Sequence, residues 1–378
     1  MARLKTILIL CPFFSPNIGG VETHLDDLVA KLDDLNYRVF VQSYSPITTQ
    51  NVKWFKLEKK NNITIRRYYW FGKHLFHKVE KYPIIDFLYL TPYLLIRSFI
   101  WMTFNHKKID IIHAHGFNAS AIGVILKKVF HKKLITSTHA IYELNPKSTT
   151  AKFIVNILNK SDALLTLSQG STNELLSFGI NPQKIHLYKY WIQTKNFYQL
   201  DKIKTRKKMN IEDKFTVLFI GRLIEKKGVR LLVKVAQKLK QINFIFIGLG
   251  PEEKYLQKQT KYKNIKYLGQ IPNNKLLNYY NCADIFCIPS LYEEGFGRVV
   301  MEAVACGLPV IGSNKGGIKE ALDSSVSILT KPTFNNLKTN ILNLSTNKKL
   351  YQKLQSNTIN YARENFSDKN IKLITKYF

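Results

Sequence analysis

The stretch from residue 289 to 317, PSLYEEGFGRVVMEAVACGLPVIGSNKGG, constrains the fold of this chain more than any other. It predicts the end of a strand, a glycine-containing loop, a helix from about Arg298 to Cys306, a short strand and a second glycine loop. Gly295 and Gly297 have no Cβ atoms, so a ligand can come close to their backbone. The N–H groups and positive dipole end of the helix would point at the same loop, where they would stabilise an anion.

Two acidic residues, Glu294 and Glu302, bracket this loop. Their carboxylates could hold hydroxyl groups on either side of the anion, so the unit suits a sugar phosphate. Glu302 falls off the apolar helix face that contains Val300 and Val304, and its side chain can therefore face a groove. The alternative is an ordinary i,i−4 pair between Glu302 and Arg298 on a solvated face. The glycines and the second acid favour a functional role.

The rest of the chain repeats one plan twice. A buried strand over residues 6–10 precedes a glycine pair and a helix over about 21–35, and a strand over 216–220 precedes Gly221 and another helix. Further strands are expected at residues 39–42, 109–113, 134–137, 163–167, 244–247, 266–268, 285–288 and 309–312. Helical stretches between most of these strands predict parallel sheets in two Rossmann-like α/β domains. A chain of 378 residues also exceeds what one hydrophobic core usually serves.

The cysteines and apolar runs indicate a cytoplasmic protein. Cys11, Cys282, Cys287 and Cys306 lie in or beside apolar runs with no paired framework, so we expect reduced core residues. The apolar region over residues 82–104 is interrupted by charged residues and predicts a poor spanning helix.

The 289–317 stretch resembles the E-x7-E region of retaining GT-B glycosyltransferases of the GT4 type (glycosyltransferase group 1). The family pattern matches Glu294-Gly295-Phe296-Gly297, Glu302-Ala303, Ala305, Gly307, Pro309-Val310 and Gly316-Gly317. The resemblance implies two Rossmann-like domains with parallel sheets facing a central cleft. We expect an acceptor domain over residues 1–198, a nucleotide-sugar donor domain over 199–355, and a C-terminal helix over 356–378 that crosses back to the N-terminal domain.

Two further motifs in the second half resemble the same family. Gly221-Arg222-Leu223, followed by Lys226-Lys227-Gly228, is similar to its G-R-L-x3-K-G signature, and GLGP at 248–251 is similar to its G-x-G-P turn. By this resemblance Arg222 and Lys227 stabilise the leaving diphosphate, a role that suits a planar guanidinium and a point charge. Gly221 and Gly250 would lie near the nucleotide.

In the first half, Gly19-Gly20 resembles the family's N-terminal glycine loop, and His139 resembles a histidine near the donor sugar. We predict donor contacts for Gly19, Gly20 and His139. His115 stays a candidate, and His113 is expected to be structural. One departure concerns residues 187–193, LYKYWIQ, where the family usually has N-G-V-D.

The resemblance implies transfer of a sugar from a nucleotide-diphosphate sugar, a UDP-sugar by expectation, to a hydroxyl of a glycan or lipid-linked acceptor. It implies retention of configuration, with no cofactor and no metal. Glu294 would hold the donor sugar and Glu302 the ribose, beside the loop formed by Gly295, Phe296 and Gly297.

The net charge of +31 implies an anionic partner or surface. Basic residues and aromatics alternate between Trp54 and Lys108, which suits peripheral contact with an anionic membrane on its cytoplasmic face. An ordinary surface with buried aromatics is the alternative, and no nucleic-acid module accompanies the basic residues. A sugar-nucleotide epimerase and a non-catalytic basic binding protein are the competing functions.

Overall fold

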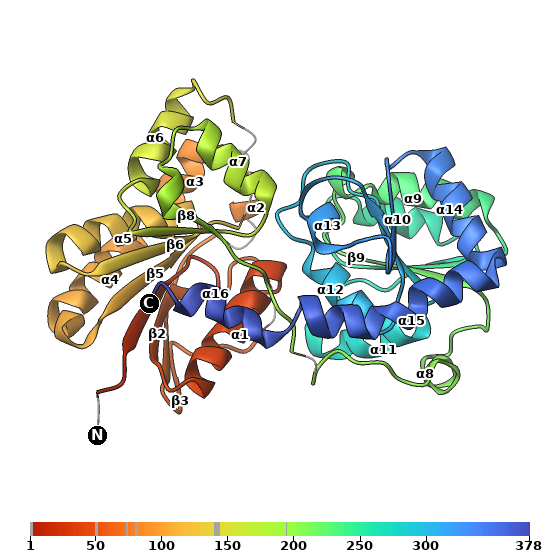
Figure 1. The fold of residues 1–378 in the computed structure, drawn as a ribbon, viewed down its shortest axis with the longest axis horizontal. Coiled ribbons are helices and arrows are strands. Elements are labelled where there is room, and N and C mark those ends of the chain that lie inside the picture. The colour runs from red at the N-terminus through yellow and green to blue at the C-terminus, as the bar shows by residue number, and fades with distance from the viewer. Residues whose placement is uncertain (1–2, 50–51, 73–74, 80–81, 140–143, 194) are drawn as a thin grey trace. The chain divides into compact units, whose positions relative to one another are not determined.

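The computed structural model describes residues 3–49, 52–72, 75–79, 82–139, 144–193 and 195–378. The chain forms two compact units, the first made of residues 1–189 and 369–378 and the second of residues 190–368. In each unit helices pack around a sheet that is wholly or largely parallel (Figure 1). The predicted α/β class and the predicted parallel sheets are confirmed.

The described part of the first unit has an eight-stranded sheet in the order β3-β4-β2-β1-β5-β6-β7-β8. All neighbouring strands run parallel except β3 and β4. The strands are β1 (Thr6–Leu10), β2 (Arg38–Tyr44), β3 (Leu57–Lys60), β4 (Ile63–Tyr68), β5 (Ile111–His115), β6 (Lys133–Ser137), β7 (Ala163–Thr166) and β8 (Ile185–Leu187). The α-helices are α1 (Gly20–Asp34), α2 (Leu75–Val79), α3 (Pro83–Leu90), α4 (Pro92–Asn105), α5 (Phe117–Phe130), α6 (Thr149–Leu158), α7 (Gln169–Ser177) and α16 (Lys372–Thr375).

The second unit has a six-stranded parallel sheet in the order β11-β10-β9-β12-β13-β14 over its described residues. The strands are β9 (Thr216–Ile220), β10 (Asn243–Ile247), β11 (Ile265–Tyr267), β12 (Ile285–Ile288), β13 (Val310–Ser313) and β14 (Ser327–Thr330). The α-helices are α8 (Lys202–Met209), α9 (Val229–Lys238), α10 (Glu253–Gln259), α11 (Leu276–Cys282), α12 (Arg298–Ala305), α13 (Gly316–Ala321), α14 (Phe334–Thr346) and α15 (Lys348–Asn365).

The central strands are almost continuously apolar because helices cover both of their faces. Every residue of β1, TILIL, and of β9, TVLFI, is buried. Strands β1, β9 and β12 have the predicted bounds, and most of the others differ by one or two residues. Strands β3, β4, β8 and β14 were not predicted. Strands β3, β8 and β14 are only three or four residues long, and β4 interrupts its apolar residues with Arg66 and Arg67.

The apolar region from residue 82 to 104 forms two consecutive helices, α3 and α4. Pro92 begins α4, where its missing N–H costs nothing. Together with the 3-10 turn His106–Lys108, these helices are long and apolar enough to cross a membrane by length and composition, and only 28% of the apolar window is buried.

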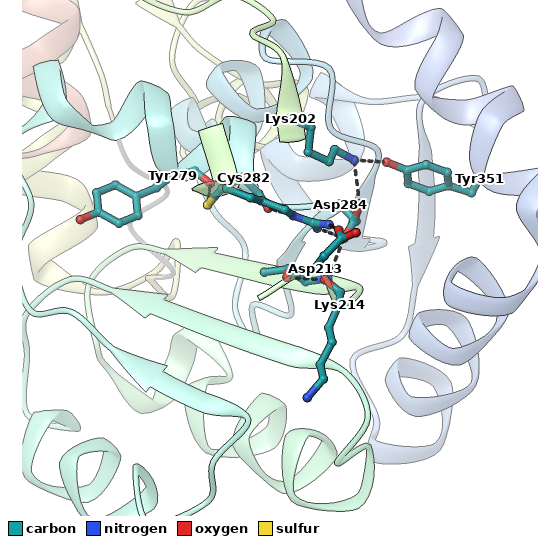
Figure 2. Close-up of polar contacts among 9 residues, drawn as sticks. Lys202, Asp213, Lys214, Tyr279, Cys282, Asp284 and Tyr351 are labelled. Carbon is teal, nitrogen blue, oxygen red and sulfur yellow. Dashed lines mark hydrogen bonds and ion pairs between the residues drawn. The ribbon is translucent and has the colours of Figure 1, made fainter. Parts of the chain in front are cut away.

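A buried polar network anchors α8 to the sheet of the second unit (Figure 2). The Asp284 carboxylate accepts from Lys202 at 2.7 Å, from the Arg206 guanidinium and from the backbone N–H of Thr216 at 2.7 Å. Lys202 also donates to the Tyr351 hydroxyl at 2.8 Å, which joins α8 to α15. One carboxylate therefore fixes the start of β9 relative to the helices around it.

The C-terminal residues 369–378 belong to the first unit. Phe378 packs edge-on against Tyr37 and His113, with ring centroids 5.8 Å and 5.6 Å away, and Tyr377 stacks on His186 at 4.1 Å. The preceding helix α15 packs against α12 in the second unit.

Candidate functional site

The two glycine loops of the 289–317 stretch pack backbone against backbone. The N–H of Gly317 donates to the carbonyl of Glu294 at 2.7 Å. A Cβ on Gly317 would lie 2.1 Å from the carbonyl oxygen of Gly295, and Gly316 has a φ of +54°. These glycines are therefore required by close packing of the chain itself.

Lys227 and Glu294 form a buried ion pair, with 2.6 Å between Nζ and Oε2 and side-chain exposures of 12% and 7%. The Ser290 hydroxyl donates to the other carboxylate oxygen, Oε1. Lys227 comes from the 3-10 turn Glu225–Lys227 after β9, and Glu294 from the loop after β12. These strands are neighbours, so their carboxyl ends bring the lysine and the acid together.

Arg222 lies in the same part of the second unit. Burial raises the pKa of Tyr292, while the positive charges of Lys227 and Arg222 lower it. The ammonium groups of Lys226 and Lys227 lie 5.8 Å and 5.7 Å from the Tyr292 ring centroid. Three cations thus lie near one aromatic side chain that the sequence did not single out, and one of them, Lys227, forms the ion pair with Glu294.

The glycines after β9 and β10 allow two turns to meet. The N–H of Gly221 donates to the Ile247 carbonyl at 3.0 Å, and that of Leu223 donates to the Leu249 carbonyl at 2.8 Å. Gly250 has a φ of +155°, and a Cβ there would lie 2.4 Å from the Leu223 carbonyl oxygen. A Cβ on Gly221 would approach only the Phe219 ring, at 3.7 Å.

Helix α12 begins directly after Gly297, and no side chain among the described residues caps it. Phe296, one residue earlier, is half-buried and lies edge-on to Tyr190 at 5.8 Å. The helix start therefore keeps the polarity that an anion would favour, next to the Gly295–Gly297 loop.

Glu302 is 1% exposed, so its face of α12 is neither solvated nor an open groove. Its carboxylate accepts from Tyr280 at 2.8 Å, from Asn273 at 3.3 Å and from Arg298 at 3.1 Å. Burial raises the pKa of Glu302, and these partners oppose the rise. The i,i−4 pair between Glu302 and Arg298, which was the alternative to a functional role, is present, but it is buried and not on a solvated face. Contact with a ribose stays a prediction and requires Glu302 to exchange one of these partners.

The segment that departs from the family pattern is built into this site. Arg298 donates to the carbonyl of Trp191 at 3.3 Å, and the Trp191 side chain is 1% exposed. Residues 190–191 thus contact Phe296 just before α12 and Arg298 at the start of α12. The local sequence change is accommodated by packing of large side chains beside the helix start.

The predicted residues Gly19, Gly20 and His139 lie in the first unit. Gly19 is extended and precedes α1, which begins at Gly20. His139 lies beyond the end of β6, and its Nε2 is 3.0 Å from Nδ1 of His115 at the end of β5. His24, on α1, is fully buried and lies 6.2 Å from His139 between ring centroids.

The structure thus groups His113 and His115 of one strand with His24 and His139, which come from distant parts of the sequence. His113 is fully buried, bonds Ser137 at 2.8 Å, and has its pKa lowered by burial to about 3. Burial lowers the pKa of His139 to about 4 and that of His115 well below its ordinary value. These three side chains are therefore neutral at physiological pH. The sequence signal for this part of the cluster was a histidine at the end of one strand, His115 on β5, and another shortly after the neighbouring strand, His139 after β6.

The comparisons with known proteins decide the family. Residues 201–364 match the family "Glycosyl transferases group 1", and residues 18–192 match "Glycosyltransferase Family 4". Together the two matches cover most of the chain. The chain is a GT-B glycosyltransferase. This glycosyltransferase is 24% identical to the phosphatidylinositol N-acetylglucosaminyltransferase GPI3 subunit of Saccharomyces cerevisiae, over 86% of the chain and 72% of that protein. It is 26% identical to an uncharacterized glycosyltransferase of Methanocaldococcus jannaschii, over 100% of this chain and 99% of that protein.

Solved structures share the fold of this glycosyltransferase. HepE of Anabaena, crystallised in complex with UDP-glucose, superposes with a TM-score of 0.77 at 20% identity, over 98% of both chains. The catalytic domain of starch synthase IV from Arabidopsis thaliana, bound to ADP and acarbose, gives a TM-score of 0.76 at 14% identity, over 100% of this chain and 99% of that one. The predicted GT-B fold is confirmed.

Proposed function

We propose that this glycosyltransferase transfers a sugar, with retention of configuration and without a metal, from a UDP-sugar to a hydroxyl of a lipid-linked or cell-envelope glycan acceptor. The observation that carries the donor assignment is the group of Lys227, Arg222 and the start of α12 around the Gly295–Gly297 loop. Structural neighbours crystallised with UDP, UDP-glucose or ADP support a nucleotide-sugar donor.

The chemistry follows from these charges. As the bond between the sugar and the diphosphate breaks, negative charge grows on the departing phosphate oxygen. Lys227, Arg222 and the α12 dipole would stabilise that charge in place. The acceptor oxygen forms the new bond to the sugar, and its proton passes to the phosphate oxygen.

Neither glutamate is placed as an open nucleophile. Glu294 is neutralised by Lys227 and bonded by Ser290, and Glu302 is enclosed by its three partners. This supports donor-phosphate-assisted attack without a covalent glycosyl-enzyme. In this proposal Glu294 exchanges its bonds for hydroxyls of the donor sugar, and His139 contributes a neutral imidazole on the first unit.

The relatives support a lipid-linked acceptor, since the yeast and human proteins are named as phosphatidylinositol N-acetylglucosaminyltransferase subunits. Helices α3 and α4 expose large apolar side chains to the surroundings. They are Ile84, Ile85, Leu88, Ile96, Phe99, Ile100 and Phe104. The aromatic residues predicted to contact the membrane are only partly exposed. Tyr68 is buried, and Trp70 stacks on Tyr44 and on Tyr93. We propose that α3 and α4 rest on the cytoplasmic face of a membrane.

The test is turnover of a UDP-sugar panel by purified protein in a metal chelator, with the anomeric configuration of the product read by NMR. Arg222 is exposed, so Arg222→Ala should fold normally and lower kcat by about 10²–10³. Lys226→Ala removes a neighbouring positive charge and should change kcat little. Turnover that needs a metal, inversion of the anomer, or an unchanged Arg222→Ala variant would contradict the corresponding part of the proposal. Conversion of the donor without any acceptor would indicate an epimerase.

A further inference from the structure

The sheet of the first unit carries a polar cavity of about 440 Å³, away from the histidine cluster. Strands β2, β3 and β4 form its floor, and the end of α4 forms one wall. Gln42 pairs with Arg66, and Thr64 pairs with both Phe40 and Lys59. Because side chains alternate along a strand, these residues lie on one face of the sheet.

The cavity is lined by cations without an accompanying acid. Among the described residues, its lining includes Arg38, Lys59, Arg66 and Lys108 and no aspartate or glutamate. Within the described residues none of these four makes an ion pair, whereas Arg67 on the opposite face of β4 pairs with Glu58. The positive potential here is therefore not neutralised by the protein itself.

One buried polar side chain in the lining lacks a partner. Gln42 is 1% exposed, and neither Nε2 nor Oε1 has a hydrogen-bond partner among the residues that the structure describes. Buried amides are almost always hydrogen-bonded, so an unpaired one in a cavity wall indicates a ligand that completes the bonds. A phosphate oxygen can accept from the Gln42 amide while the surrounding cations balance its charge.

The surroundings of the cavity indicate where that phosphate comes from. Trp101, on α4, lines the cavity and lies 5.1 Å from Phe40 between ring centroids. The neighbouring residues Ile100 and Phe104 are 52% and 80% exposed. The helix that walls the cavity therefore presents large apolar side chains outward, as a helix lying in a bilayer interface does. With α4 in the interface, the cavity would lie level with the lipid headgroups.

We propose that this cavity binds the phosphate group of an anionic lipid. The inference rests on the membrane contact proposed for α3 and α4, and it is independent of the nucleotide site. The proposal is that specific residues of this cavity recognise the lipid phosphate. General attraction between a basic protein and negatively charged lipid would not require a cavity.

The first experiment measures binding of monomeric dihexanoyl phosphatidate by calorimetry, which needs no bilayer. Wild type should bind it, and Gln42→Leu, which changes no charge, should bind at least about tenfold more weakly. The double variant Lys59→Glu/Arg66→Glu should lose binding. Lys234→Glu/Lys238→Glu, on exposed positions of α9, makes the same change in net charge and should bind like wild type. Equal losses of lipid binding in the two double variants, or unchanged lipid binding in Gln42→Leu, would overturn the proposal that this cavity binds the phosphate.

The second experiment distinguishes the source of the phosphate. Sedimentation with phosphatidylcholine vesicles, with and without phosphatidylglycerol, should show about thirtyfold weaker binding of the Lys59→Glu/Arg66→Glu variant to the anionic vesicles only. Inorganic phosphate should not compete at concentrations where dihexanoyl phosphatidate does. Competition by both to the same extent would overturn the lipid assignment.

The remaining control separates this inference from the membrane contact on which it rests. Phe104→Ser should weaken vesicle binding and leave binding of the monomeric lipid unchanged. Wild-type protein that binds neither probe would overturn the inference, whatever the outcome of the UDP-sugar assay. Thermal unfolding of each variant confirms that it is folded.

Discussion

At the scale of single residues, the structure distinguishes two adjacent lysines that the sequence leaves equivalent. The ammonium of Lys227 lies on the buried Glu294 carboxylate in the second unit, whereas the Lys226 side chain is exposed. Lys227→Met should destabilise the protein by about 2–4 kcal/mol, because it leaves a buried carboxylate without its counter-charge. Lys226→Met should change the free energy of unfolding by less than about 0.5 kcal/mol. Urea denaturation of both variants measures the difference, and equal values would contradict the assignment.

The histidine cluster makes the stability of the first unit depend on pH. Burial lowers the pKa of His113 to about 3 and that of His139 to about 4, from ordinary values near 6.5. The unfolded chain therefore takes up protons first, and stability that is present above pH 6.5 is lost as the pH falls toward 4. Each of these two histidines should contribute about 3 kcal/mol of this loss by pH 4, or about 6 kcal/mol together.

Urea denaturation at a series of pH values measures this loss, and His113→Asn is the matching variant. It removes one buried titrating group and should flatten the dependence between pH 6.5 and 4. A variant that is less stable at every pH but retains the wild-type slope would show that His113 does not contribute to it.

At the scale of helices and strands, the Asp284 network should be essential to the second unit. Asp284→Asn leaves Arg206 and Lys202 without their shared counter-charge and should cost about 3–5 kcal/mol. Asp213→Asn is the control, since Asp213 bonds the same Arg206 but its side chain is 88% exposed. It should cost at most about 1 kcal/mol. Chemical denaturation compares them, and similar costs would contradict a special role for the buried carboxylate.

The glycine loops offer a second test at this scale. A Cβ on Gly317 would collide with the Gly295 carbonyl, whereas one on Gly221 would not approach backbone at all. Gly317→Ala should therefore destabilise the protein by about 1–3 kcal/mol. Gly221→Ala should leave stability within about 0.5 kcal/mol of wild type, because no strain arises. Thermal unfolding checks both, and a stable Gly317→Ala protein would show that the two loops can separate.

Sequence periodicity sufficed to predict the central strands, because a strand buried on both faces is a continuous apolar run. It did not predict β3, whose residues are all exposed, or the separation of the 82–104 region into α3 and α4. Residues 57–60 form a strand because they pair with β4, and Pro92 separates α3 from α4.

The motifs were predictable in a different way. Spacing brought Glu294 and Lys227 to the ends of neighbouring strands, but it could not show that they bond each other. Nor could it show that Glu302 is enclosed by Tyr280 and Asn273, since both of these come from a separate part of the chain. Side-chain partners across long sequence separations depend on packing, which a local pattern does not contain.

At the scale of the whole molecule, the chain combines a GT-B glycosyltransferase fold with a net charge of +31. Part of that charge is unpaired in the cavity beside α4, and part, on Lys227 and Arg222, lies near Tyr292 before the α12 start. These two groups of cations belong to different units and suit different anions. The positive charge therefore serves at least two separable purposes in this account, a nucleotide diphosphate and a lipid surface.

The most direct test of the central claim is the thermal shift produced by UDP. Ligand that binds only the folded protein raises Tm by mass action. We predict that saturating UDP raises Tm by about 3 °C or more in wild type and in Lys226→Met. It should raise Tm much less in Lys227→Met and Arg222→Ala. If UDP produces no shift in wild type, or the same shift in all four proteins, the proposed diphosphate site at Lys227, Arg222 and the start of α12 is wrong.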